Sequence, residues 1–198
     1  MIPKVEFRYS WIYDENLKDW IKRNPSNQRK DFTPEDLRKY AKEIEKKWRK
    51  YAPKILKEIQ KISSLRWKEK KIICYIVSRA IPFSDPLTMP IFKDKNRFID
   101  VLTHELIHQI FTQEGNLKQA EMSWDYFFKK YKEENYKVQI HIPLQAIHKH
   151  IYLKLFNEKR FEEELRIMGN YKDYKKAWEI VNTSDYKELI KEFKDNLK

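Results

Sequence analysis

The segment from Asn96 to Gly115 restricts the folding of this chain more than any other. Apolar side chains recur on nearly every side of a helix drawn through it: Phe98, Ile99, Leu102, Leu106, Ile107, Ile110 and Phe111. A helix that is apolar almost all round is a buried helix. Gly115, one of only two glycines, stands where such a helix needs a left-handed residue to end. We therefore expect a buried helix that closes at Gly115.

The same helix carries His104, Glu105 and His108. Histidines four apart lie one turn apart on one helical face, so both imidazoles can reach a single zinc ion. Glu105 lies beside them, where it can take a proton from a zinc-bound water. Each polar group buried without a partner costs about 1–3 kcal/mol, and one metal ion would satisfy all three. The alternative is a surface helix on which these side chains only face water.

A catalytic zinc site usually has three protein ligands, so a third must come from elsewhere. The other histidines are His141, His148 and His150, and the last falls on a lysine-bearing side that we expect to be exposed. We favour His141, because Pro143 is expected to open a helix and the helix dipole would keep an imidazole just before it neutral. Gln145, one turn later, would then be its hydrogen-bond partner.

Two other third ligands stay open. His148 shares the inner stripe of the same expected helix. Glu121 is a carboxylate on an otherwise apolar stripe, with Asp125 four residues later.

The stretch His104-Glu105-Leu106-Ile107-His108 resembles the HExxH signature of the zincin metallopeptidases. The residues from His141 to His148 resemble a segment of small archaeal and viral zincin-like proteins, whereas Glu121 to Asp125 resemble the ExxxD of gluzincins, including minigluzincins. The resemblance covers residues 71–156. It implies a zinc-dependent peptidase or hydrolase that acts on a peptide or protein substrate.

The site implies a mechanism in which zinc lowers the pKa of a water and Glu105 transfers protons. Tyr136, Tyr152 and His150 are candidates for steadying the oxyanion. A latent enzyme, with the C-terminal helices over its cleft, is a further hypothesis.

The periodicities predict an α+β, predominantly helical, zincin-like fold with a small sheet and an edge strand before the motif helix. Strands are expected at 4–11, 64–68 and 71–78. Residues 87–92 are expected to form either an edge strand, to which a peptide could add by strand pairing, or a rigid irregular loop. Helices are expected at 33–63 with an interruption or a kink at Pro53, then at 96–114, 117–134, 143–157, 161–168, 172–181 and 184–197. Residues 22–32 are expected to form a loop, and 136–140 to be extended. We expect one domain, 1–198, made of a basic part (1–70), a metal-site core (71–156) and a C-terminal helical appendage (157–198).

The chain has a net charge of +12, concentrated in residues 1–70, which hold 20 Lys and Arg against 11 Asp and Glu. A solvated helix face explains such interleaved charge, but phosphate binding with base stacking on Trp48, Tyr51 and Trp67 is an alternative. The protein would then be a nucleic-acid-associated protein with a structural or latent zinc site.

The single cysteine, Cys74, lies in an apolar run and is expected to be a buried structural thiol. The first residues lack the apolar core of a signal peptide, and no stretch has the length of a membrane span. We therefore expect a cytoplasmic protein without a membrane partner.

Overall fold

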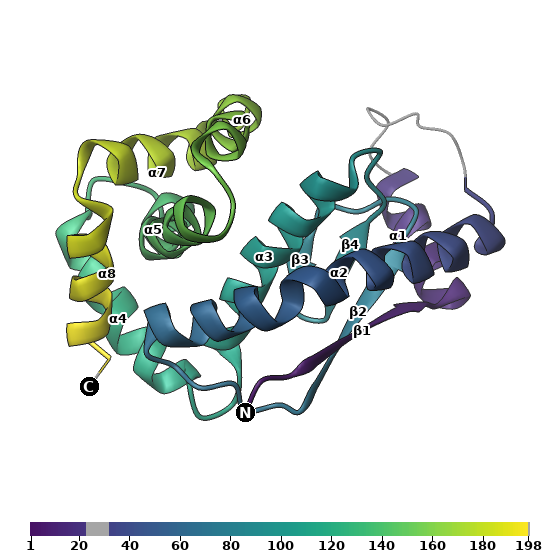
Figure 1. The fold of residues 1–198 in the computed structure, drawn as a ribbon. Coiled ribbons are helices and arrows are strands. Elements are labelled where there is room, and N and C mark those ends of the chain that lie inside the picture. The colour runs from purple at the N-terminus through teal and green to yellow at the C-terminus, as the bar shows by residue number, and fades with distance from the viewer. Residues whose placement is uncertain (23–31, 198) are drawn as a thin grey trace. The chain divides into compact units, whose positions relative to one another are not determined.

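The computed structural model describes residues 1–22 and 32–197, and it is mostly helical with one small sheet (Figure 1). The α+β, predominantly helical class is confirmed. The loop expected at 22–32 lies almost wholly outside the described residues. The elements are β1 (Lys4–Tyr9), α1 (Trp11–Lys22), α2 (Pro34–Ser63), β2 (Lys71–Val77), β3 (Phe83–Ser84), β4 (Leu87–Pro90), α3 (Lys95–Thr112), α4 (Leu117–Lys130), α5 (Tyr136–Leu155), α6 (Glu158–Met168), α7 (Lys172–Thr183) and α8 (Tyr186–Asp195).

The chain packs into two compact units. Unit 1 comprises Met1–Pro53 and Glu69–Gln109, and unit 2 comprises Lys54–Lys68 and Ile110–Lys198. Helices α2 and α3 contribute to both, so the units cut across the three segments expected from the sequence.

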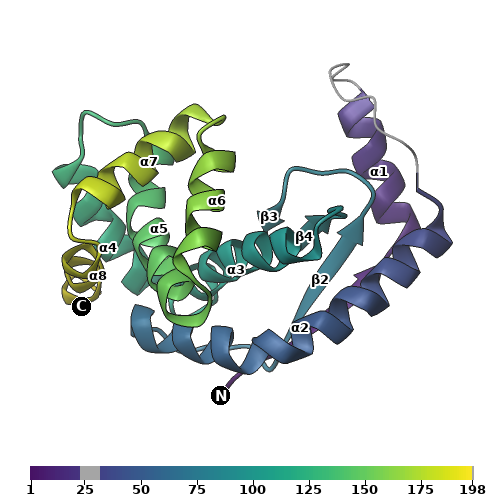
Figure 2. The same cartoon turned by 45° about the horizontal axis from the view of Figure 1, so that its top comes forward.

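The sheet of unit 1 has the order β1-β2-β4-β3, with β1, β2 and β4 parallel and β3 antiparallel to β4. Figure 2 shows the strands β2, β4 and β3 of this sheet. Every second residue of β2 points to one face, where Ile72, Cys74 and Ile76 are buried. On that face the ring centroid of Phe98 in α3 lies 6.1 Å from that of Phe7 in β1 and 5.8 Å from that of Tyr40 in α2. Helices α2 and α3 therefore cover this face of the sheet.

The strand expected at the edge, 87–92, is not an edge strand. Strand β4 lies between β2 and β3, because Phe83 and Ser84 turn back and pair with Thr88 and Leu87. The side chain of Gln109 in α3 donates to the carbonyl of Ser84, which ties β3 to the helix. Peptide addition along these β4 residues would require displacement of β3.

Two other strand predictions also need correction. Residues 64–68 form no strand: the Lys68 N–H donates to Oε1 of Gln113 at 2.8 Å, and the Trp67 indole donates to the Leu56 carbonyl at 3.0 Å. These polar groups thus bind α2 and the turn after α3, and not a neighbouring strand. Trp11 does not end β1 but begins α1, a helix that the alternating pattern did not reveal.

Helix α2 begins as the sequence predicts. The Thr33 hydroxyl accepts from the Asp36 N–H at 3.1 Å, and the Asp36 carboxylate accepts from the Thr33 N–H at 3.0 Å, which is a reciprocal cap. Of the two alternatives for Pro53, the interruption does not occur, since one helix runs to Ser63. Buried residues on both sides, Trp48 and Ile55 among them, hold the helix together where one backbone hydrogen bond is missing.

Unit 2 is built around α5, which packs against α4, α6, α7 and α8. Its buried residues include Val138, Ile142, Leu144, Ile147, Ile151 and Tyr152. Helix α5 starts at Tyr136, capped by the Asn135 side chain, which accepts from the Val138 N–H at 3.1 Å. The predictions of an extended segment at 136–140 and of a helix that starts at Pro143 are therefore wrong. The three C-terminal helices form as predicted and share one core with α5.

No helix among the described residues is long and apolar enough to cross a membrane.

Helix α1 is fixed to the sheet by a buried carboxylate. Oδ1 of Asp14 accepts from the Ser78 N–H at 2.7 Å and from the Ser78 hydroxyl at 2.8 Å. The Asp14 side chain is fully buried, and Lys18 lies 3.3 Å from Oδ2.

We predict that Asp14→Ala lowers the free energy of unfolding by about 3 kcal/mol, because it removes a charged acceptor and leaves buried donors without it. Urea unfolding followed by circular dichroism measures this. Glu15→Ala on the same helix is the control, since the Glu15 side chain is 42% exposed where it pairs with Lys18 and its loss should cost less than about 1 kcal/mol. Equal losses of unfolding free energy in Asp14→Ala and Glu15→Ala would contradict the role of Asp14 in fixing α1 to the sheet.

Candidate metal centre

Helix α3 brings His104, Glu105 and His108 to one region of unit 1. His104 and Glu105 are 8% and 7% exposed, while His108 is partly exposed. The two imidazole rings lie 5.0 Å apart between centroids, as the i,i+4 spacing predicts. The helix is buried on nearly every side and Gly115 has a left-handed φ of +82°, as expected, but the helix ends at Thr112, three residues before this glycine.

His141 lies in the second turn of α5 in unit 2 and is 5% exposed. Its Nδ1 is 2.6 Å from the carbonyl oxygen of Lys137, one turn earlier, and its ring packs 4.7 Å from that of Tyr174 in α7. Because a carbonyl only accepts, Nδ1 carries the proton and the lone pair is on Nε2. This is the tautomer that a metal ligand needs.

The reasons given for His141 need correction, because it lies inside the helix. Burial, and not the dipole of a helix start, is the main cause that lowers its pKa to about 4 and keeps the ring neutral at physiological pH. Its hydrogen-bond partner is the Lys137 carbonyl, while the Gln145 amide reaches towards the Tyr174 carbonyl at 3.5 Å. Asn135 was the signal in the sequence: a helix capped there places residues 137 and 141 one turn apart.

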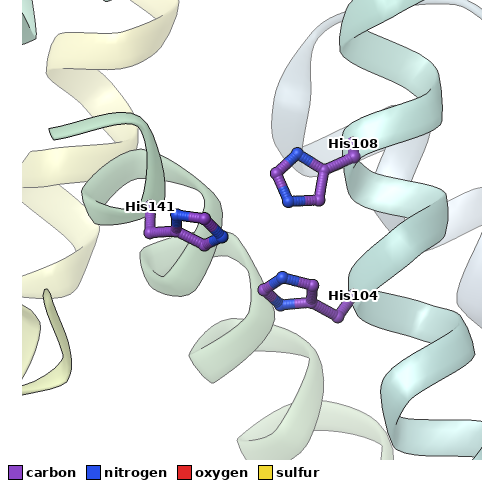
Figure 3. A group of neighbouring side chains, drawn as sticks. All are labelled: His104, His108 and His141. Atoms are coloured by element: carbon purple, nitrogen blue, oxygen red, sulfur yellow. The ribbon is translucent and has the colours of Figure 1, made fainter. Parts of the chain in front are cut away.

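One ligand atom from each of His104, His108 and His141 lies within 4.8 Å of the others (Figure 3). Among the described residues this is the group of His, Cys, Asp and Glu side chains that could hold a metal ion. Three nitrogens at 2.0–2.1 Å from one zinc ion are roughly 3.3 Å apart in a tetrahedral site.

The other third-ligand candidates are not in this group. His148 is 1% exposed and lies against aromatic rings, with centroids 4.6 Å from Tyr152 and 6.3 Å from Trp178. Glu121 and Asp125 are both exposed on α4, because the buried stripe of that helix contains Ala120, Ser123 and Phe127 instead.

The candidates for an oxyanion stabiliser have other roles within unit 2. The Tyr152 hydroxyl donates to the buried carboxylate of Glu164 at 3.0 Å. His150 is only partly exposed and pairs with Glu58 at 3.0 Å, and Tyr136 is 66% exposed.

Glu105 lies deep in unit 1, and burial raises its pKa to about 8. It is near enough to Cys74 of β2 for the two charges to repel, and burial together with this repulsion raises the pKa of the thiol well above its ordinary value. Cys74 is thus a buried, protonated thiol, as expected. Glu105 holds its proton near neutral pH unless a cation lies beside it.

No protein-family model matches the chain, and searches of curated proteins and of solved structures found no significant match.

The raised pKa of Glu105 makes the stability of the metal-free protein depend on pH. The folded state holds this proton up to about pH 8, whereas an unfolded glutamate loses it near 4.5, so stability falls as the pH rises between these values. We predict that Glu105→Gln, which stays neutral, unfolds at a higher temperature than the wild type at pH 8 and at a similar temperature at pH 4.5.

The free energy of unfolding changes by about 1.4 kcal/mol for each pH unit in that window. Thermal unfolding in the presence of a chelator therefore resolves the effect. Glu114→Gln, at an exposed position just beyond α3, is the control and should show the wild-type pH profile. A constant difference between Glu105→Gln and the wild type across this range would contradict the assignment.

Proposed function

We propose that this protein is a zinc-dependent metallopeptidase of the zincin type, which hydrolyses peptide bonds with a water activated by the metal. The observation that carries the proposal is the group of three histidine ligand atoms within 4.8 Å, with Glu105 adjacent in sequence to the first ligand. Two ligands one turn apart, a glutamate next to the first and a third ligand from a later helix are the parts that such a site requires.

The donor set favours zinc over the other common metals. Three neutral imidazoles suit Zn²⁺, and a three-ligand site keeps a position open for water or substrate. The Lys137 carbonyl supports this fit, because a histidine that binds metal through one nitrogen almost always donates from the other. When bound, the ion would supply a Lewis acid that lowers the pKa of a water and polarises a carbonyl group.

Glu105 would be the proton carrier. A cation beside it would shift its pKa down from about 8, so that it is a carboxylate able to accept a proton from the attacking water. It would then return the proton to the leaving amine of the peptide bond. A group whose pKa can lie near the operating pH performs both transfers well.

The burial of Glu105 suits this role. The side chain is 7% exposed, and it is near enough to Cys74 of β2 to raise the pKa of that thiol. A low-dielectric environment strengthens the interaction of the carboxylate with a neighbouring cation or proton.

The first test is Glu105→Gln, assayed on a library of internally quenched fluorescent peptides with one equivalent of zinc. We expect the rate to fall by roughly 10²–10⁴ or more, because the general base is lost, while bound zinc stays near one per chain because no ligand is removed. Unchanged cleavage would disprove the catalytic assignment, and a wild type that binds zinc but cleaves no peptide would disprove the peptidase proposal.

The second test identifies the third ligand. We expect His141→Ala to weaken zinc binding by roughly 100-fold or more, measured by competition with a chromogenic chelator, since it removes a ligand directly. Glu121→Ala should bind zinc like the wild type, because its side chain is exposed.

His148→Ala controls for the loss of a buried imidazole from the same helix. It should destabilise unit 2 but keep wild-type zinc affinity at temperatures where the variant is folded. Loss of zinc from either control and not from His141→Ala would contradict the assignment.

A further inference from the structure

Seven lysines form one continuous line on α2. Lys39, Lys42, Lys46, Lys50, Lys54, Lys57 and Lys61 follow one another at steps of three or four residues, and all seven are exposed. Such steps keep side chains on one face of a helix. At 1.5 Å per residue, this lysine stripe is about 33 Å long.

The acidic side chains of the same part of α2 form their ion pairs with cations outside the lysine stripe, although Glu43 also attracts Lys39. Glu43 pairs with Lys95 at 2.7 Å, and Glu45 pairs with Arg49 at 2.9 Å. Glu58 is buried and pairs with His150 and Lys154 of α5.

Within the part of the chain that the structure describes, none of the seven lysines lies in an ion pair. The interleaving of charges in the sequence is therefore misleading, because the acids bind other cations. The exposed side of α2 remains a line of positive charge.

Aromatic side chains near the stripe are not available to nucleic acid bases. Trp48 and Trp67 are 2% and 3% exposed, and the indole of Trp67 is hydrogen bonded within unit 2. The stacking predicted for these two residues is therefore wrong. Tyr51 is only partly exposed and lies three residues before Lys54 of the stripe.

We propose that the lysine stripe of α2 binds the phosphate backbone of double-stranded nucleic acid without reading its sequence. Single-strand binders combine a basic groove with exposed aromatic platforms, whereas Trp48 and Trp67 are buried here. A duplex instead offers a stiff array of phosphates, one charge per 1.7 Å of axis, which a line of lysines along one helix can follow for about ten base pairs. The binding would be independent of the metal centre.

The test measures binding of a fluorescent 20-base-pair DNA duplex by anisotropy between 50 and 300 mM salt. Neutralising n phosphates gives a slope of log K against log salt of about −0.9n, so the wild type should show a slope between about −4 and −6. Replacing Lys46, Lys50 and Lys57 by Gln should reduce the slope by about 2.7 and the affinity at 100 mM salt at least tenfold. Gln has nearly the helix propensity of Lys, so α2 should keep its structure, which circular dichroism checks.

The matched control replaces Lys118, Lys129 and Lys159 by Gln. These three lysines are exposed and lie outside α2. Their replacement lowers the net charge from +12 to +9, as the three substitutions on α2 also do. The control should bind the duplex with an affinity within about twofold of the wild type. Glu105→Gln should also bind the duplex within about twofold, because that substitution tests only the metal centre.

Three outcomes would overturn the proposal. Equal loss in the two triple variants would show a general charge effect. Tighter binding of a single strand of the same length would exclude a duplex site. Absence of duplex binding, with binding to vesicles of 30% phosphatidylserine in phosphatidylcholine, would assign the stripe to a membrane surface.

Discussion

Burial of α3 is the constraint on which the rest of unit 1 depends. The helix is apolar on almost every side, so it must be covered, and the parallel strands and α2 provide a face on which Phe98 and Leu102 are fully buried. The same burial takes His104 and Glu105 out of water. Their polar groups lie where electrostatic interactions are strong and where the charged form of an unpaired acid is costly. One physical cause therefore explains both the packing of the helix and the raised pKa of Glu105.

The position of His141 depends on a different core. Helix α5 is surrounded by α4, α6, α7 and α8, and Tyr174 of α7 packs against the imidazole. Its orientation comes from the Lys137 carbonyl, which is a consequence of helical geometry alone. The C-terminal helices therefore have a direct part in presenting this histidine, because they form the surroundings of its ring. A role for them as a removable cover is not required to explain their packing.

The positive charge that α2 exposes depends on which ion pairs form as well as on the composition of the chain. The net charge of +12 would suggest a diffuse basic surface, yet Glu43 and Glu58 on α2 bind cations of other elements. Those pairs leave the lysine stripe intact on the exposed side. A pattern of alternating signs in a sequence therefore does not show which charges compensate each other, since partners are chosen by contacts in space.

The sequence by itself determined the buried motif helix, its end near Gly115, the start of α2 at Thr33 and the three C-terminal helices, because these depend on local periodicity and capping. It also suggested His141, although for a helix start that does not exist. Only the tertiary structure decided that α5 runs through Pro143, that β4 is paired on both sides, and that His141 and not Glu121 lies near His104 and His108. Packing of distant segments supplies the free energy that overrides a proline, and it chooses which of several polar side chains meet.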